Sequence, residues 1–248
     1  MKWVSILGCA VLASAACPLG PADAAPRTYF YVITHRPFGT IGTYERTIDV
    51  VGDDTSAKSR LDIAVKALGF VVHRETSDQT EFWRGKRLIS FHSVTFIDGQ
   101  QLLVRGEALE NRFVVTSPSG TAVAPADVAA SDPLSLDRMG PGVVVSLKTG
   151  EITPAEVTGG ETATVTRLGV PEPTRHFHVN IPMQADEWQV WFDRWGVPIK
   201  FCTYESSGPV DFTLVSPAQT GPLENNGANQ FLLAKEQLAP SGSPLPSP

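Results

Sequence analysis

The feature that most limits the fold is a succession of short alternating runs separated by turn residues. From Thr28 onward, apolar or β-branched residues alternate with polar ones, and glycine, proline, asparagine or aspartate separates one run from the next. Strands joined by tight turns show this pattern, whereas an amphipathic helix repeats its apolar residues every three or four positions. About a dozen runs follow one another up to Val215. They predict an all-β chain whose curved antiparallel sheet closes into a half-barrel or a barrel.

The clearest pair of strands is the segment 188–205, which holds three of the five tryptophans. Trp188, Val190 and Phe192 share one face of an extended chain, because successive side chains of a strand point to opposite sides. Residues 193–196 (Asp-Arg-Trp-Gly) supply a turn that ends in glycine, and the alternation resumes after it. We predict a hairpin here that carries the densest apolar wall of the sheet.

Further strands are expected wherever the alternation continues between turn residues. The run 59–68 fits a helix or a strand by spacing, and its strand-rich surroundings favour a strand. The pattern breaks once, at Asp127 to Met139, where Pro133 suits a first helical turn and glycines follow the run; we expect a short crossover helix there. The other predicted strands are 28–33, 40–51, 70–83, 87–97, 101–109, 112–116, 121–124, 143–147, 151–158, 162–168, 174–181 and 210–215.

Residues 1–24 have the pattern of a secretory signal peptide. Lys2 precedes an apolar run that is shorter than a membrane span, and Ala22-Asp23-Ala24 has the small residues that a cleavage site requires. The chain is therefore expected to be periplasmic or secreted. An alternative is a lipoprotein signal, in which Cys17 would carry the lipid anchor.

The remaining chain divides into a domain and a tail. We expect a single all-β domain over residues 25–216. Residues 217–248 are rich in proline, glycine and serine, which predicts a mostly disordered C-terminal tail. Removal of the signal peptide leaves Cys202 as the only cysteine, so no internal disulfide is expected and the fold must depend on its core.

Charge and motifs exclude several functions. The 20 basic and 26 acidic residues give a net charge of −6, which argues against a nucleic-acid partner. No later apolar run is long enough for a transmembrane segment. The nucleophile elbow, zinc-protease, P-loop, paired-cysteine and EF-hand motifs are all missing from the sequence. No catalytic residue and no cofactor is predicted, and a non-enzymatic role is favoured.

His176 and His178 form the sharpest metal-like pattern. Two residues apart on a strand, both imidazoles point to the same side, and a third ligand from a neighbouring strand would complete a site with one open position. His35, His73 or His92 is the expected donor. The alternative is a partly exposed strand with two ordinary histidines, and it is favoured because no acidic residue stands at a fixed spacing beside the pair.

The strand predicted at 70–83 is unusually charged. Arg74, Thr76 and Asp78 share one face of it. If that face were interior, the charged pair could recognise a polar head group inside a barrel. If it is exterior, it is a solvated surface, and this second interpretation is favoured.

Several motifs together resemble an uncharacterised secreted bacterial family, the domain of unknown function 6134. The resemblance covers about residues 28–214 and implies neither catalytic residues nor a known ligand. The pattern is also similar to that of periplasmic half-barrels that carry lipoprotein acyl chains, which implies an apolar concavity. The motifs are Ile-Gly-Thr at 41–43, Leu-Asp-Ile-Ala-Val-Lys-x-Leu-Gly-Phe at 61–70, Glu-x-Trp-Arg-Gly-x-Arg-Leu at 81–88, Thr-Gly-Glu at 149–151 and Val-Trp-Phe-Asp-x-x-Gly at 190–196.

Three functions are carried forward. The first is a periplasmic protein that binds or carries an apolar, lipid-like ligand in the curved sheet. The second is an envelope assembly or interaction factor that docks a protein partner. The third is a metal-dependent enzyme that uses His176 and His178. The apolar wall expected to line the ligand site consists of Phe91, Phe96, Trp188, Val190, Phe192 and Phe201.

Overall fold

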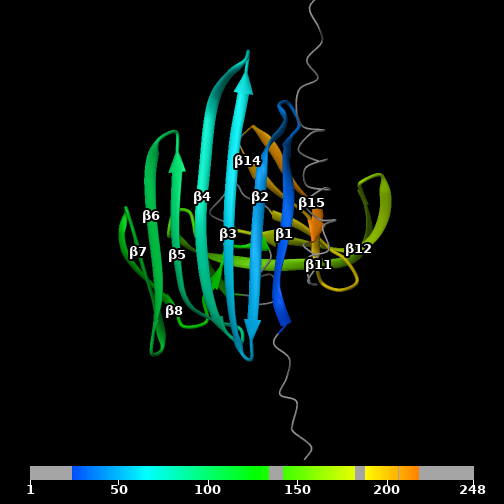
Figure 1. Ribbon diagram of the computed structural model, residues 1–248. Coiled ribbons are helices and arrows are strands. Elements are labelled where there is room, and N and C mark those ends of the chain that lie inside the picture. Colours follow the sequence, from blue (N-terminus) through cyan, green and yellow to red (C-terminus); the bar gives the residue numbers. More distant parts are fainter. Residues whose placement is uncertain (1–23, 134–141, 182–187, 206, 218–248) are drawn as a thin grey trace, which may run out of the picture.

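A computed structural model describes residues 24–133, 142–181, 188–205 and 207–217 of the chain (Figure 1). These residues form one sheet of fifteen strands and contain no α-helix. The strands are β1 (Ala24–His35), β2 (Gly39–Val51), β3 (Asp54–Ala67), β4 (Phe70–Arg84), β5 (Arg87–Ile97), β6 (Gln100–Leu109), β7 (Arg112–Ser117), β8 (Gly120–Pro125), β9 (Ala129–Ala130), β10 (Gly142–Val145), β11 (Ile152–Arg167), β12 (Val170–Asn180), β13 (Trp188–Phe192), β14 (Pro198–Glu205) and β15 (Gly208–Pro217).

The sheet is a single meander with β1 at its centre. From β1 the chain runs strand by strand to the edge at β8, crosses to the opposite edge at β9, and returns strand by strand to β15, which pairs with β1. All neighbouring strands are antiparallel except β9 and β10, which are parallel. Only residues 126–128 separate the two edge strands in sequence. The sheet must therefore curl until its two edges approach each other, although no ladder of hydrogen bonds joins them in the described residues.

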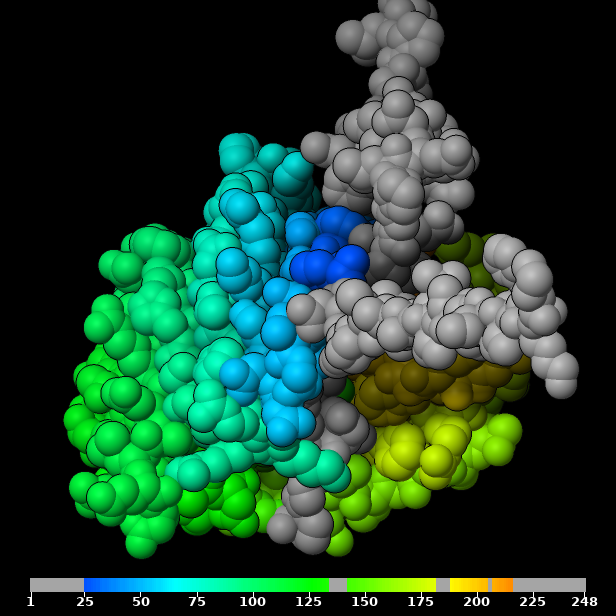
Figure 2. All heavy atoms as spheres, turned by 60° about the horizontal axis from the view of Figure 1, so that its bottom comes forward, coloured from blue at the N-terminus to red at the C-terminus, as the bar shows by residue number. Residues whose placement is uncertain are grey.

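The curling places the two halves of the sheet against each other. Strands β1–β5 run side by side, and β11 and β12 pass across them (Figure 1). In Figure 2 the strands up to β8, blue to green, and the later strands, yellow-green to dark gold, occupy adjoining parts of the surface. Between the halves lies one apolar core, in which Ile33, Trp83, Phe113, Val145 and Val190 are completely buried. The predicted all-β curved sheet is thus confirmed.

Close packing of the core depends on Gly106 in β6. Phe91 of β5 and Phe113 of β7 stack beside it with ring centroids 6.0 Å apart, where a side chain at position 106 would lie. A Cβ at position 106 would lie 2.1 Å from Cε1 of Phe91 and 2.4 Å from Cε1 of Phe113. The missing side chain of this glycine is therefore what lets the two rings approach, because interiors leave no room for an added methyl group.

Two expectations about local structure are corrected. The segment Asp127 to Met139 does make the crossover, but its described part contains strand β9 and no α-helix, and residues 134–139 lie outside the described residues. Ala129 and Ala130 are buried and pair with Val144 and Val145, so tertiary pairing overrides the local helix signals. The runs predicted at 151–158 and 162–168 form one strand, β11.

The signal peptide and the disordered tail expected at the two ends of the chain remain predictions. The expected signal peptide lies outside the described residues except for Ala24, and the expected tail lies outside them except for Pro217. No helix long and apolar enough to cross a membrane occurs in the part of the chain that the structure describes.

Candidate functional site

A cavity of about 250 Å³ remains between the two halves of the sheet. One side is aromatic and comes mainly from the last strands, with Trp188 of β13, Phe201 of β14 and Phe212 of β15. The opposite side is polar and comes mainly from β4 and β5. Its residues are Glu75, Ser77, Gln79 and Thr95, joined by Lys148 from the turn after β10. The two sides give the cavity an amphipathic lining.

The aromatic side is built by register across three antiparallel strands. Val190, Phe201 and Phe212 stand opposite one another on β13, β14 and β15, so their side chains share one face. Phe201 and Phe212 stack with centroids 4.2 Å apart, and Tyr31 contacts Phe201 edge-on at 5.3 Å. These contacts hold the rings in fixed positions, which preserves the shape of the wall.

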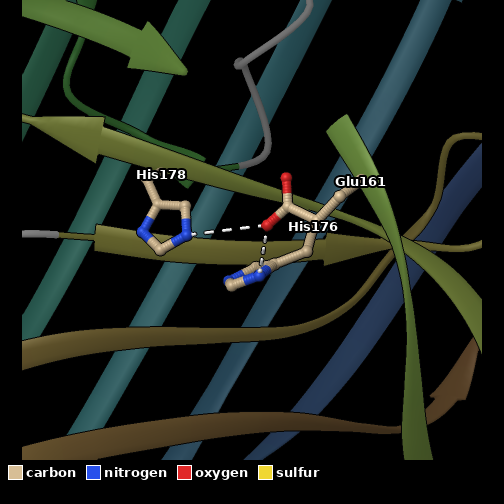
Figure 3. A group of neighbouring side chains, drawn as sticks. All are labelled: Glu161, His176 and His178. Carbon is tan, nitrogen blue, oxygen red and sulfur yellow. Dashed lines mark ion pairs between the residues drawn. The ribbon is translucent and has the colours of Figure 1, made fainter. Parts of the chain in front are cut away.

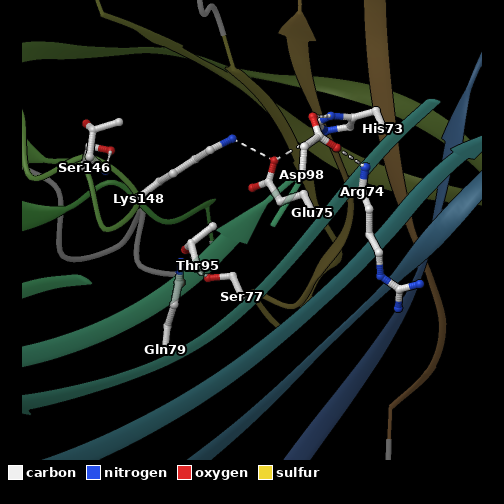
Figure 4. A network of polar contacts seen from close by, with 10 residues as sticks. His73, Arg74, Glu75, Ser77, Gln79, Thr95, Asp98, Ser146 and Lys148 are labelled. Carbon is white, nitrogen blue, oxygen red and sulfur yellow. Dashed lines mark hydrogen bonds and ion pairs between the residues drawn. The ribbon is translucent and has the colours of Figure 1, made fainter. Parts of the chain in front are cut away.

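The polar side follows from alternation along β4 (Figure 4). Glu75, Ser77 and Gln79 are two residues apart, so their side chains share one face of the strand. The low exposure of these residues identifies that face as the interior one. Oγ of Ser77 lies 2.8 Å from Oγ1 of Thr95 on β5, and Nε2 of Gln79 donates to Oγ of Ser77 at 3.2 Å. Nζ of Lys148 donates to Oε2 of Glu75 at 2.8 Å. Hydroxyl, amide, carboxylate and ammonium groups therefore face the cavity together.

The Glu75–Lys148 pair lies at the rim of the cavity. The Glu75 side chain is 9% exposed and the Lys148 side chain 40%. Next to it, the turn at Asp98 is held by the backbone N–H of Arg74, which donates to Oδ1 of Asp98 at 2.7 Å, and by Nδ1 of His73, 3.0 Å from Oδ2 (Figure 4). Those hydrogen bonds lower the pKa of Asp98, that from the Arg74 N–H most. This turn fixes one end of the polar wall.

A buried ionic cluster lies inside the sheet beside the cavity. Arg46 of β2 contacts Glu81 at 2.9 Å and Asp132 at 2.8 Å, and none of the three side chains is more than 5% exposed. Nε1 of Trp83 donates to Glu81 at 3.0 Å. Burial alone would lower the pKa of Arg46, but the carboxylates of Asp132 and Glu81 raise it well above its usual value. Arg46 therefore stays charged and must keep its partners.

Tyr44 of β2 connects this ionic cluster to the cavity. Its ring lines the cavity, and its hydroxyl donates to Oγ of Ser59 at 3.1 Å, the same oxygen that accepts from Arg46. Burial, followed by the negative charge of Asp132, raises the pKa of Tyr44 to about 12. The phenol is therefore a neutral donor at physiological pH.

The structure brings together only part of the expected apolar wall. Trp188 and Phe201 line the cavity, and Val190 lies fully buried beside them. Phe192 packs edge-on against the ring of Phe177, 5.7 Å away. Phe91 belongs to the core stack beside Gly106 and does not line the cavity.

Phe96 and the charged face of β4 point to the opposite side of the sheet. Phe96 is 43% exposed, and the Arg74 side chain is 58% exposed, as expected for a solvated surface. What the sequence interpretation missed is the other face of the same strand, with Glu75 and Glu81 buried. Trp83 was the available signal, because a tryptophan two residues from Glu81 marks that face as interior.

A second cluster of polar groups lies on the outer side of β11 and β12 (Figure 3). Oε1 of Glu161 lies 3.0 Å from Nδ1 of His176 and 3.8 Å from Nε2 of His178. The pKa of the Glu161 carboxyl group is lowered, mainly by a hydrogen bond from its own backbone N–H. Desolvation opposes this effect, and the two histidines lower the pKa further. None of the three residues lines the cavity.

None of the three histidines expected as a third ligand lies beside His176 and His178, and this part of the metal prediction was therefore wrong. His35 is buried and contacts Ser207, His73 contacts Asp98, and His92 is exposed on β5. The third partner is instead a carboxylate, that of Glu161, from the neighbouring strand.

Comparison with known proteins bears on the family and the fold. The sequence profile of the domain of unknown function DUF6134 matches residues 38–214. A crystal structure of a β-barrel-like protein of the domain of unknown function DUF1849 from Brucella abortus is similar, with a TM-score of 0.54 and 11% sequence identity over 79% of this chain and 98% of that chain. No curated protein matches the sequence. The likeness supports a barrel-like fold and carries no statement about activity.

Proposed function

The chain belongs to the DUF6134 family of unknown function, and we propose that it is an exported binding protein that holds a small amphipathic, lipid-like ligand in the cavity of its curved sheet. The observation that carries this proposal is the lining of the cavity, with aromatic rings on one side and hydrogen-bonding groups on the other. Ligand sites in proteins combine an apolar wall with a few placed polar groups in this way.

The aromatic side would receive the apolar part of the ligand. Trp188, Phe201 and Phe212 offer a preformed surface, so the ligand does not have to order it. Covering about 100 Å² of apolar ligand surface contributes about 2.5 kcal/mol. The volume of about 250 Å³ lies just below the roughly 300–1,000 Å³ of typical small-molecule sites. A single short chain or ring therefore fits better than a whole phospholipid.

The polar side would receive the head group. Ser77, Gln79 and Thr95 supply neutral donors and acceptors, and Lys148 supplies a cation at the rim. Because the ammonium group of Lys148 has three N–H donors and its side chain is 40% exposed, it can contact a ligand while keeping its hydrogen bond to the nearly buried Glu75. A carboxylate or hydroxyl head group would find partners on this wall without leaving a buried group unpaired.

The cellular location is part of the proposal. The N-terminal segment 1–24 has the charged start, apolar run and small-residue site of a signal peptide, which supports export to the periplasm or the medium. An apolar ligand in an aqueous compartment needs a protein that shields it from water, and the cavity would provide that shield.

Binding of octanoic acid, an unlabelled fatty acid with a single short chain, tests this function by isothermal titration calorimetry. We expect saturable binding to the wild-type chain, and native mass spectrometry should detect one bound ligand. Trp188→Ala should weaken binding by at least about tenfold, which corresponds to about 1.4 kcal/mol. Trp195→Ala is the matched control, because this tryptophan is 73% exposed in the turn between β13 and β14.

A second variant, Gln79→Ala, tests the polar wall and should weaken the binding of octanoic acid without abolishing it. Equal affinity of the Trp188 and Trp195 variants, or no saturable binding to the wild-type chain, would exclude this cavity as a ligand site. If a stoichiometric protein partner is then captured from envelope extracts, the assembly function replaces the carrier function.

A further inference from the structure

We propose that Glu161, His176 and His178 form a binding site for a divalent transition-metal ion, for which Zn²⁺ is the best fit, on the outer side of β11 and β12 (Figure 3). The site is independent of the proposed cavity ligand, because none of its residues lines the cavity. It offers two imidazole nitrogens and one carboxylate oxygen.

The distances suit tetrahedral coordination. One oxygen of Glu161 lies 3.0 Å from a His176 nitrogen and 3.8 Å from a His178 nitrogen, and all three ligand atoms lie within 4.8 Å of one another. Zinc–nitrogen and zinc–oxygen distances near 2.0–2.1 Å require ligand atoms about 3.3 Å apart at the corners of a tetrahedron. The observed spacings bracket that value, so small side-chain rotations suffice to close the site.

The backbone of β11 is shaped to bring the carboxylate to the histidines. His178 stands opposite Thr158, but His176 stands opposite Glu161, because a β-bulge at Gly159 and Gly160 shifts the register. Both glycines have positive φ, 97° and 99°. A Cβ at Gly159 would lie 2.7 Å from the carbonyl oxygen of His176. The bulge therefore requires glycine, and its effect is to re-aim one side chain, as bulges beside functional sites do.

A second layer of side chains orients His176. Nε2 of Gln189 donates to the hydroxyl oxygen of Tyr204 at 3.0 Å, which turns the amide oxygen of Gln189 toward His176. That oxygen lies 3.2 Å from Nε2 of His176. Because an amide oxygen only accepts, it favours a proton on Nε2 of His176, so Nδ1, 3.0 Å from Glu161, is the nitrogen that would bind an ion. Metal-binding histidines are oriented in this way by a hydrogen bond to their other nitrogen.

Ring packing holds the same geometry. The His176 ring stacks on Trp191 with centroids 4.3 Å apart and planes 6° from parallel. The centroids of the His176 and His178 rings are 4.4 Å apart. At that separation, Nδ1 of His176 and Nε2 of His178 both lie within 4 Å of the same oxygen of Glu161. A single surface ion pair with Glu161 needs only one of the two histidines, and the convergence of both favours a metal.

The ligand set selects the class of ion. Imidazole suits zinc and its neighbours, whereas Mg²⁺ and Ca²⁺ prefer a shell of oxygens. Three protein ligands leave one position for water, as in zinc sites that are open to a substrate. The exposed side chain of Glu161, at 52%, leaves that position accessible from solvent.

Titration calorimetry of the full chain, purified without a polyhistidine tag, tests the site with Zn²⁺ alone. We expect one Zn²⁺ per chain and no measurable binding of Mg²⁺ or Ca²⁺. His178→Ala and Glu161→Gln should each weaken Zn²⁺ binding by at least about tenfold. His92→Ala, an exposed histidine on β5, is the matched control and should bind as the wild-type chain does.

Gln189→Leu separates metal ligation from adventitious binding to surface histidines. Removing the group that orients His176 should weaken the binding of Zn²⁺ about 10–100-fold while leaving one site per chain. Co²⁺ provides a second readout, because tetrahedral coordination gives intense visible absorption that His178→Ala should abolish. Circular dichroism verifies that each variant is folded. Absence of a one-to-one site, or equal Zn²⁺ affinity in the His178 and His92 variants, overturns the proposal.

Discussion

Replacing Arg46 with methionine removes the cation that Glu81 and Asp132 share inside the sheet. Arg46 contacts these carboxylates at 2.9 Å and 2.8 Å, and all three side chains are almost fully shielded from water. Methionine follows the path of the aliphatic stem of arginine, so the change removes charge and hydrogen bonds while leaving little empty space. The two carboxylates would then lie buried beside each other without a counter-ion.

The expected loss of stability is about 3–5 kcal/mol, the usual cost of breaking a buried ion pair by removing one partner. Whole domains are stable by only about 5–15 kcal/mol, so the variant should be close to the limit of folding. With a urea m-value of about 2–3 kcal/mol/M, the unfolding midpoint should fall by roughly 1–2 M. Equilibrium urea unfolding followed by tryptophan fluorescence measures this shift, because Trp83 contacts Glu81 directly.

Arg84→Met is the matched control. Arg84 also forms an ion pair, with Asp54 at 2.8 Å, but the two side chains are 63% and 40% exposed. Water already solvates both charges, so the urea midpoint should hardly change. Adding Glu81→Gln and Asp132→Asn to Arg46→Met should restore much of the lost stability, because no buried charge is left. If Arg46→Met shifts the midpoint no more than Arg84→Met does, the inference that the cluster is buried and charged is refuted.

Two further variants probe the interior. Gly106→Ala should lower the free energy of unfolding, measured in urea, by about 1–3 kcal/mol, because the added Cβ would overlap the ring of Phe91. Phe91→Leu in the same chain should recover part of the loss. An unchanged stability of Gly106→Ala would contradict the close packing. Tyr44, whose pKa is about 12 when folded and near 10 when unfolded, contributes stability that is complete below pH 10 and is lost between pH 10 and 12. That contribution is about 2–3 kcal/mol, and urea unfolding at pH 9 and pH 11 should show a smaller decrease for Tyr44→Phe than for the wild type.

The strand positions could be predicted from the sequence because alternation and turn chemistry are local. The run predicted at 87–97 coincides with β5, and the ambiguous run at 59–68 lies in β3 except for Leu68, which follows the end of that strand. Asp98 and Gly99 both have positive φ, 51° and 86°, as a tight hairpin turn requires. Single residues and their immediate neighbours contain this information, so no knowledge of distant contacts was needed.

The crossover segment shows where local information fails. A helix was predicted from Asp127 onward, yet Ala129 and Ala130 join the sheet edge at Val144 and Val145. Burial of this pair decides the conformation, and burial depends on how the whole sheet curls. Local propensity is a weak prior against such a tertiary contact.

The candidate sites depended on the same non-local information. Lys148, in the turn after β10, reaches Glu75 of β4 only because the second half of the sheet folds over the first, and the two residues are far apart in the chain. Glu161 meets His176 because two glycines shift the register of β11 by one residue. A one-residue slip moves every later side chain to the other face, so a hairpin without the bulge would not place the carboxylate beside both histidines. Two adjacent glycines within a strand pattern were the available signal, since they mark a bulge that re-aims a neighbouring side chain.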